Sequence, residues 1–337
     1  MSLDKIIITN LPAFYKINLF NRIAEKCSIF LIFTGLDGEI RNENFYDSEM
    51  NFPYIFLKGG SKKEKFLEAF AVIKNKKPNK IIIGGWDNII YLLIAFLFPI
   101  RKNQLIVESS YLESTTTGIK GLIKKIFLKR ISKVFASGDN QEVLVRKLGF
   151  KGEVSKTGGV GIFDIAKQPT FIKKNEIKNF LYVGRFSEEK NLKFLINYFN
   201  QFPELSFSLV GYGPLENELK QISKSNIHFL GAINNKNLKE VYKQYDVFIL
   251  GSTREPWGLV VEEALNCGLP ILLSNKAGII SEYSDTDMII SFNPKDLKSF
   301  DSAVKNIITP AIYNKMAEKI SHLDFEKKAD QQTNVYI

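Results

Sequence analysis

Residues Glu255 to Ala264 read Glu-Pro-Trp-Gly-Leu-Val-Val-Glu-Glu-Ala. Two of the carboxylates, Glu255 and Glu263, stand eight positions apart, and a Pro-Trp-Gly turn precedes the apolar residues of an expected helix. We therefore expect Glu255 in a loop and Glu263 on the helix, with unpaired backbone N–H groups at the helix start between them. A helix start binds anions, so the stretch suits a ligand with an anionic centre and hydroxyl-rich ends, such as a nucleotide sugar. The alternative is an ordinary amphipathic helix with acidic residues near its positive end.

The stretch resembles the Glu-x7-Glu signature of retaining glycosyltransferases of family 4, which have the GT-B fold. The resemblance implies that Glu263 holds the nucleotide ribose and that Glu255 binds a hydroxyl of the donor sugar. It also implies donor contacts, largely through backbone amides, from the residues between these two carboxylates. These are Pro256, Trp257, Gly258 and Leu259.

A second motif supplies cations. Residues 182–192 read Tyr-Val-Gly-Arg-Phe-Ser-Glu-Glu-Lys-Asn-Leu and resemble the Gly-Arg-Leu…Lys-Gly segment of the same family. The resemblance implies that Gly184, Arg185 and Lys190 contact the diphosphate, where fixed cations stabilise the negative charge of the leaving group. Asn191 stands where the family usually has glycine. The alternative is a solvated turn of mixed charge.

Two glycine turns add to the resemblance. Residues 209–216 read Leu-Val-Gly-Tyr-Gly-Pro-Leu-Glu, and residues 226–232 end a strand on Phe-Leu-Gly. A dinucleotide-binding turn would need a third glycine where Glu216 stands, so that interpretation is not favoured. The family resemblance instead implies contacts near the nucleotide base from a small set of residues. These are Gly211, Tyr212, Gly213 and Gly231.

Short apolar runs alternate with helical patterns through both halves of the chain, which predicts βαβ units and parallel sheets. The expected fold is α/β of the GT-B type, with two Rossmann-like domains whose parallel sheets face each other across a cleft. We expect an acceptor-binding domain at residues 1–165 and a nucleotide-sugar-binding domain at 166–315. A C-terminal helix within 316–337 is expected to cross back to the first domain. The lysine-rich stretch 166–178 is the expected linker.

The first half carries weaker signals for an acceptor site. Loops after expected strands hold Tyr15 and Lys16, then Trp86 and Asp87 behind a Gly-Gly pair, then Glu108. Because ligands bind at the carboxyl ends of parallel strands, we expect these side chains to contact the acceptor. Glu108 and Asp87 are also candidate catalytic groups, since no histidine lies in this half; the catalytic set otherwise comprises Arg185, Lys190 and Glu255. An ordinary loop and a packing tryptophan are the alternatives.

The net positive charge of the chain comes entirely from its first half. Residues 1–160 hold 25 Lys and Arg against 15 Asp and Glu, whereas residues 161–337 hold 21 of each. Residues 118–133 interleave apolar positions with cations at helical spacing, which suits an anionic membrane surface or a core helix with a basic outer face. No nucleic-acid-binding motif is found. The apolar run 89–100 is too short to span a bilayer and is expected to be a buried helix.

The resemblance implies a hexosyltransferase-like enzyme that moves a sugar from a nucleotide diphosphate sugar to a hydroxyl of a lipid-linked glycan. Bacterial surface polysaccharide or lipopolysaccharide synthesis, in the cytoplasm and peripheral on the inner face of the plasma membrane, is the expected setting. No cofactor and no metal are expected, because no aspartate pair follows a strand as a metal site would require. The alternatives are a GT-B sugar-nucleotide epimerase and a non-catalytic nucleotide-sugar-binding protein. The donor base, the sugar and the acceptor stay open.

Overall fold

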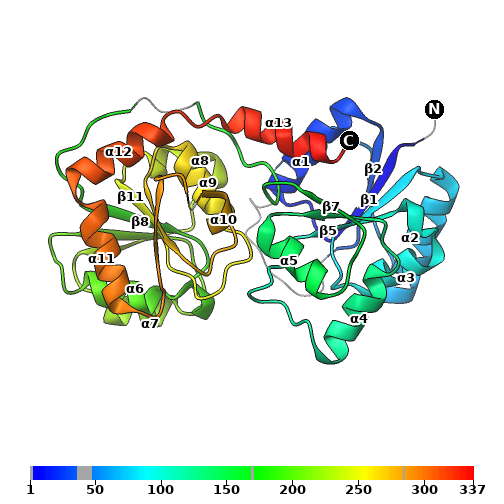
Figure 1. Cartoon of the computed structure of the whole chain (residues 1–337), viewed down its shortest axis with the longest axis horizontal. Coiled ribbons are helices and arrows are strands. Elements are labelled where there is room, and N and C mark those ends of the chain that lie inside the picture. Colours follow the sequence, from blue (N-terminus) through cyan, green and yellow to red (C-terminus); the bar gives the residue numbers. More distant parts are fainter. Residues whose placement is uncertain (1–2, 36–47, 168–170, 284) are drawn as a thin grey trace. The chain divides into compact units, whose positions relative to one another are not determined.

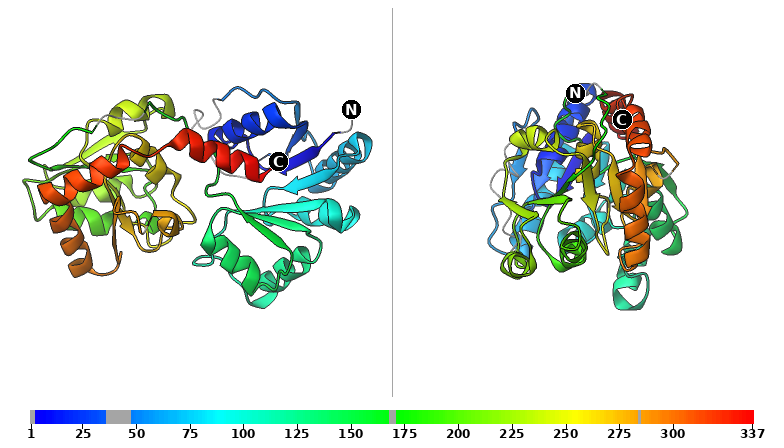
Figure 2. Two further views of the ribbon diagram at one scale, coloured as in Figure 1. Left: turned by 45° about the horizontal axis from the view of Figure 1, so that its top comes forward. Right: turned by 90° about the vertical axis from the view of Figure 1, so that its left-hand side faces the viewer.

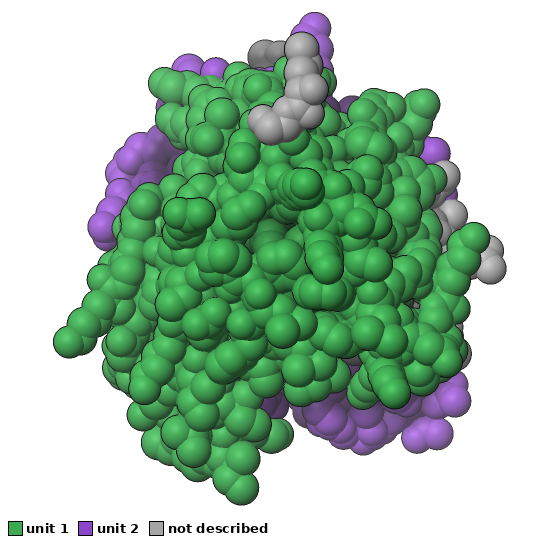
Figure 3. All heavy atoms as spheres, turned by 90° about the vertical axis from the view of Figure 1, so that its right-hand side faces the viewer, with its two compact units in different colours: residues 1–163, 327–337 green, residues 164–326 purple. Residues whose placement is uncertain are grey.

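The computed structural model describes residues 3–35, 48–167, 171–283 and 285–337. It divides into two compact units, one formed by residues 1–163 with 327–337 and the other by 164–326 (Figure 3). The sequence placed its boundaries at 165/166 and 315/316. Of the expected linker, residues 168–170 lie outside the described residues.

Unit 1 contains a parallel sheet with strand order β3-β2-β1-β4-β5-β6-β7. Helices cover both of its faces (Figures 1 and 2). The strands are β1 (Lys5–Thr9), β2 (Ile29–Phe33), β3 (Tyr54–Phe56), β4 (Lys80–Ile83), β5 (Asn103–Val107), β6 (Lys133–Ala136) and β7 (Glu153–Lys156). The helices are α1 (Phe14–Lys26), α2 (Lys62–Lys76), α3 (Ile89–Leu97), the short 3-10 helix η2 (Ile100–Lys102), α4 (Gly118–Leu128), α5 (Asp139–Lys147) and, from residue 327 onward, α13 (Phe325–Val335).

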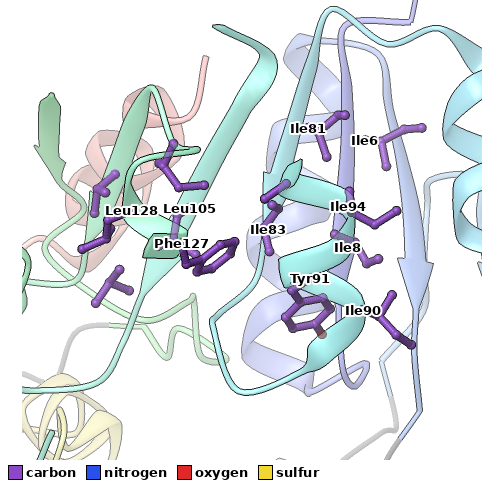
Figure 4. Packing of buried hydrophobic residues seen from close by; sticks show 14 of the residues in the cluster. Ile6, Ile8, Ile81, Ile83, Ile90, Tyr91, Ile94, Leu105, Phe127 and Leu128 are labelled. Carbon is purple, nitrogen blue, oxygen red and sulfur yellow. The ribbon is translucent and has the colours of Figure 1, made fainter. Parts of the chain in front are cut away.

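The core of unit 1 follows from the apolar runs of its central strands. A parallel sheet covered on both faces buries successive residues, so its strands read as continuous apolar stretches. In β1, for example, Ile6, Ile7 and Ile8 are all fully buried. The side chains packed on one face come from β1, β4, β5, α3 and α4 (Figure 4); those labelled are Ile6, Ile8, Ile81, Ile83, Ile90, Tyr91, Ile94, Leu105, Phe127 and Leu128.

The expectation of a buried helix over residues 89–100 is wrong. Helix α3 buries only one side, through residues such as Ile90 and Ile94. Its other side leaves large apolar side chains in solvent, including Leu97 at 54% exposed. Composition alone misled here, because an apolar run carries no polar residue to mark the outer face. Among the described residues, no helix combines the length and the apolar content needed to cross a membrane.

Unit 2 contains a second parallel sheet, with strand order β10-β9-β8-β11-β12-β13. Its strands are β8 (Asn179–Val183), β9 (Ser206–Val210), β10 (Ile227–Gly231), β11 (Val247–Leu250), β12 (Ile271–Ser274) and β13 (Ile289–Phe292). Its helices are the 3-10 helix η3 (Glu188–Lys190), α6 (Leu192–Phe199), α7 (Glu216–Ile222), α8 (Asn235–Tyr242), α9 (Leu259–Asn266), α10 (Ile280–Tyr283), α11 (Leu297–Ile307) and α12 (Pro310–Ile320). The expected α/β fold with two parallel sheets is confirmed.

Each sheet changes its winding direction once. In unit 1 the chain proceeds outward from β1 to β3 and then returns to place β4 on the other side of β1. In unit 2 the same reversal puts β11 beside β8. Loops that leave two such neighbouring strands diverge to opposite faces of the sheet, which opens a crevice where ligands of this fold class bind.

The C-terminal residues 327–337 pack with unit 1. In α13, Asn334 accepts a hydrogen bond from Lys26 of α1 at 2.9 Å. Beyond the helix, the ring of Tyr336 stacks on Phe135 of β6 with centroids 4.5 Å apart. Tyr336 is buried, whereas the next residue, Ile337, is 54% exposed. The aromatic stack therefore fastens the end of the chain to the sheet.

Replacing Tyr336 by alanine should lower the free energy of unfolding of unit 1 by about 3 kcal/mol, because a large buried ring and its stacking partner are lost. Urea denaturation followed by circular dichroism measures this change. Ile337→Ala is the matched control and should alter the free energy of unfolding by less than about 0.5 kcal/mol. Equal losses in the two variants would contradict the anchoring role of Tyr336.

Candidate functional site

The winding reversal of unit 2 brings a cation and a carboxylate together. Lys190 ends η3, which follows β8, and its Nζ lies 2.5 Å from Oε2 of Glu255 in the loop after β11. The hydroxyl of Ser252 donates to the same carboxylate oxygen at 3.3 Å. Both charged side chains are mostly buried, at 19% and 11% exposed. Their geometry is therefore fixed before any ligand arrives.

The backbone conformation of Asn191 is one that favours glycine, the residue usual at this position of the motif. Its backbone is left-handed, with φ of 59°, a conformation that favours glycine and that asparagine tolerates better than most residues. Its side-chain amide donates to the carbonyl oxygens of Gly251 at 3.2 Å and Pro294 at 2.9 Å. The departure from the family pattern therefore adds hydrogen bonds that join the loops after β8, β11 and β13.

The glycines in the turns after β8 and β9 allow backbone segments to pack directly against each other. A Cβ on Gly211 would lie 1.9 Å from the carbonyl oxygen of Gly184, and one on Gly213 would lie 2.4 Å from that of Phe186. The N–H of Gly211 also donates to the carbonyl of Gly231 at 2.8 Å. These contacts join the carboxyl ends of β8, β9 and β10 into one rim.

Two further donor-site candidates on this rim project into solvent. Arg185 is exposed, and within the described part of the chain its guanidinium makes no hydrogen bond or salt bridge. Its carbonyl oxygen accepts a hydrogen bond from the buried hydroxyl of Tyr182 at 2.9 Å, which fixes the backbone that carries it. Tyr212, in the turn after β9, is 44% exposed. Arg185 thus offers a cation that no carboxylate neutralises at hydrogen-bond distance.

Trp257 lies differently from the other donor-site candidates. Its indole is buried and donates from Nε1 to the carboxylate of Glu262 at 3.0 Å. The side chain is therefore withdrawn from the surface, and a donor contact from Trp257 stays a prediction. The next residue, Gly258, caps α9 with a φ of 107°, so that Leu259 begins the helix. Pro256 lies in the same turn, with its carbonyl against Gly278.

Glu263 lies in the second turn of α9. Its Oε2 accepts a hydrogen bond from the hydroxyl of Tyr242, the last residue of α8, at 3.1 Å. Burial raises the pKa of Glu263 to about 7, although the Tyr242 hydrogen bond acts in the opposite direction. Sequence reasoning missed Tyr242, because nothing in the local pattern of α8 indicates which distant side chain its hydroxyl meets.

Unit 1 holds a cavity of about 510 Å³ at its own winding reversal. The loops after β1, β4 and β5 line it, and all five residues that the sequence predicted for the acceptor lie among its walls. These are Tyr15, Lys16, Trp86, Asp87 and Glu108. The structure therefore brings together in one place residues that are up to 93 positions apart in the chain.

Two lining residues of this cavity form an ion pair. The Nζ of Lys16 lies 2.9 Å from a carboxylate oxygen of Glu108. Burial opposes the charge on Lys16, but the carboxylate of Glu108 and smaller effects of Tyr15 and Tyr91 together hold the pKa of Lys16 above its ordinary value. The side-chain amide of Gln141 donates to the Glu108 carbonyl at 3.1 Å and fixes its backbone. Asp87, by contrast, is exposed at the rim.

Asn10, a polar residue that sequence reasoning did not assign, also lines the cavity and is held by buried residues outside the lining. The hydroxyl of Tyr91 donates to Asn10 at 3.0 Å, and the buried hydroxyl of Thr34 lies within 3.5 Å of the same tyrosine. Asn10 directly follows β1, which is the signal that could have identified it. Within the described ranges, no group of three or more His, Cys, Asp or Glu side chains is arranged to hold a metal ion.

Comparison with known proteins finds similarity to glycosyltransferases. Residues 164–321 match the model of "Glycosyl transferases group 1". The sulfoquinovosyl transferase SQD2 of Arabidopsis thaliana is 28% identical over 44% of this chain and 30% of its own length. The O-antigen biosynthesis glycosyltransferase WbnH of Escherichia coli is 27% identical over 82% of this chain and 81% of its own. The chain thus spans less than a third of SQD2 but most of WbnH.

Solved structures share the fold over the whole chain. Sucrose-phosphate synthase from Thermosynechococcus elongatus has a TM-score of 0.75 with 17% identity, covering 99% of this chain and 98% of its own. HepE from Anabaena, in complex with UDP and glucose, has a TM-score of 0.70 with 16% identity and covers 98% of both chains. The expected GT-B fold and the resemblance to bacterial surface-polysaccharide glycosyltransferases of the family 4 type are confirmed, and these relatives support a glycosyltransferase enzyme.

Replacing Glu263 by glutamine should raise the free energy of unfolding above that of the wild type at pH 8, and the difference between the two proteins should be smaller at pH 4. The folded-state pKa of about 7 lies above the ordinary value of 4.5, so the folded protein retains a proton that the unfolded chain releases between these values. Stability contributed by this group is therefore lost as the pH rises from about 4.5 to 7, and the glutamine variant avoids that loss. The expected gain at pH 8 is at most about 3 kcal/mol, since each pKa unit corresponds to about 1.4 kcal/mol.

The measurement is chemical denaturation of the wild type and of Glu263→Gln across this pH range. If the difference between the wild type and Glu263→Gln stays constant with pH, the raised pKa of Glu263 is refuted.

Proposed function

We propose that this protein is a retaining glycosyltransferase that moves a sugar from a nucleotide diphosphate sugar to a hydroxyl of a glycan. The observation that carries the proposal is the cation and carboxylate pair of Lys190 and Glu255 at the winding reversal of unit 2, with the exposed cation of Arg185 in the loop after β8. The similarity of residues 164–321, which include this pair, to "Glycosyl transferases group 1" supports the assignment.

The donor is proposed to lie along the rim formed by the carboxyl ends of β8, β9 and β11. Arg185 and Lys190 would bind the diphosphate, and the amides at the start of α9 would bind its oxygens. Glu255 would accept a sugar hydroxyl, and Glu263 a ribose hydroxyl. HepE, which shares the fold, was solved with UDP and glucose, and we extend this to propose a UDP-sugar donor here.

The acceptor is proposed to enter the cavity of unit 1. The bond between the anomeric carbon and the leaving phosphate oxygen breaks, the acceptor hydroxyl attacks from the same face, and its proton passes to the leaving phosphate. Such a step retains the anomeric configuration and requires no protein base. Glu108 and Asp87 would orient the acceptor hydroxyl, while Arg185 and Lys190 stabilise the departing diphosphate without a cofactor or metal.

The setting we propose is bacterial surface polysaccharide synthesis at the inner face of the plasma membrane, with a lipid-linked acceptor. The similarity to WbnH, an O-antigen biosynthesis glycosyltransferase, supports the pathway class. The surplus of cations in residues 1–160 supports attachment to an anionic surface.

Replacing Arg185 or Glu263 by alanine should lower the rate of sugar transfer at least 100-fold, because each removes a charge-assisted contact to the donor. Transfer is measured with radiolabelled UDP-sugars and a mixture of bacterial glycan acceptors. Lys193→Ala is the matched control, since Lys193 pairs with Glu218 on the surface of unit 2 and should leave the rate unchanged.

The same assay separates the alternatives. A change of sugar configuration without acceptor would indicate an epimerase, and donor binding without turnover would indicate a non-catalytic binding protein. Nuclear magnetic resonance of the product reports the anomeric configuration, and inversion would refute the retaining mechanism. Full activity in both Arg185→Ala and Glu263→Ala would refute the assignment of the donor site.

A further inference from the structure

Helices α3 and α4 share a feature that the transfer reaction leaves unexplained: each turns a row of large apolar side chains to solvent. On α3 and η2 the row recurs at helical spacing, and on α4 the exposed apolar residues repeat at positions i, i+3, i+4 and i+7. The members are Ile89, Leu93, Phe96, Leu97, Ile100, Ile119, Leu122, Ile123 and Ile126. We call these nine residues the apolar surface. The most exposed of them, Ile119, is 79% accessible.

Contacts at two points join α4 and the residues just beyond it to α3 and the loop before it. Near the end of α4, the guanidinium of Arg130 donates to the carbonyl oxygens of Ala95 at 3.3 Å and Phe96 at 3.2 Å, and lies 5.4 Å from the ring of Phe96. Within α4, the Nζ of Lys124 lies 5.1 Å from the ring of Trp86, just before α3 begins. The opposite sides of both helices enter the core (Figure 4). The apolar surface is therefore a fixed part of the fold.

Cations surround the apolar surface, and acidic residues are missing from it. Lys120, Lys125 and Lys129 are exposed on α4, and Arg101 is exposed in η2. The segments 89–102 and 118–133 contain no Asp or Glu. Apolar side chains on segments that carry cations and no carboxylate match the hydrocarbon boundary and the anionic headgroups of a bilayer. A second copy of this chain fits poorly, because a symmetric pair would set cation against cation.

The apolar surface adjoins the cavity of unit 1. Ile89 belongs to both, since it begins α3 and lines the cavity. Trp86 lines the cavity as well and contacts Lys124 of α4. The interior of the cavity is polar, with the Lys16 and Glu108 pair at its wall. A molecule with a polar head and an apolar tail could therefore place the head in the cavity and the tail over Ile89.

We propose that the apolar surface docks on an anionic bilayer and presents a lipid-linked acceptor to the cavity of unit 1. The exposed rows of α3 and α4 enter the headgroup boundary, and the flanking lysines bind anionic headgroups. The acceptor then stays in the bilayer while its sugar moves past Ile89 into the polar interior. The docking on a bilayer does not depend on the proposed function, but the delivery of the acceptor rests on it.

The test uses the full chain and vesicles of phosphatidylcholine with or without phosphatidylglycerol. The wild type should sediment with the anionic vesicles and much less with the neutral ones. The double variant Leu93→Glu with Ile123→Glu should bind the anionic vesicles at least tenfold more weakly. Leu67→Glu is the matched control, because Leu67 of α2 is 51% exposed but lies outside the apolar surface. Near-ultraviolet circular dichroism checks that each variant folds.

Equal vesicle binding by the wild type and the double variant, or an equal loss in Leu67→Glu, would overturn the docking surface. So would a dimer in sedimentation velocity that the double variant dissociates. Lys120→Gln with Lys125→Gln should weaken binding to anionic vesicles and reduce its dependence on salt. Unchanged binding there would contradict the role of the lysines.

Activity assays separate this inference from the proposed function. The double variant should keep transfer to a water-soluble glycan and lose, by at least tenfold, transfer to a lipid-linked acceptor held in vesicles. Equal loss with both acceptors would overturn the delivery of the acceptor by this surface. Vesicle binding that behaves as expected in a protein without any transfer would refute the proposed function and leave the docking surface intact.

Discussion

Each of the two sheets reverses its winding direction once, and the positions of both candidate sites depend on this reversal. Between β8 and β11 the reversal brings Lys190 within 2.5 Å of Glu255, although 65 positions separate them in the chain. Between β1 and β4 it opens the cavity that Lys16 lines. Loops that leave adjacent strands in opposite directions cannot cover the sheet edge between them. The strand order therefore determines the position of the site, whichever side chains occupy the loops.

The pair of Lys190 and Glu255 illustrates preorganisation. Two opposite charges that are mostly withdrawn from water hold each other in place at the cost of their hydration. Glu255 gains a further hydrogen bond from Ser252, and Asn191 joins the loops that carry the pair. A diphosphate that binds here meets a cation already oriented, so less reorganisation is required when charge develops on a leaving group.

The sequence predicted the strands whose apolar runs are continuous. It did not predict the edge strand β7 or which face of a helix is exposed. The buried central strands, such as β1 and β11, follow from their composition. Edge strand β7 was not predicted, because its alternating polar residues do not stand out from a loop. In α3, composition gave the helix but not its exposed face.

The candidate sites show the same limit. Motif spacing led to Lys190 and Glu255, because loops at strand ends gather by topology. It could not show that the indole of Trp257 faces the protein interior toward Glu262, or that Tyr242 meets Glu263. Such contacts depend on how helices pack, and no local pattern encodes which side chains will meet.

The return of residues 327–337 to unit 1 has a consequence for how the protein is made. During translation the ribosome completes the whole of unit 2 before it delivers the aromatic ring that stacks on Phe135. Unit 2 can therefore fold before residues 327–337 are available to unit 1. Unit 1 is synthesised first, but its fold is completed last.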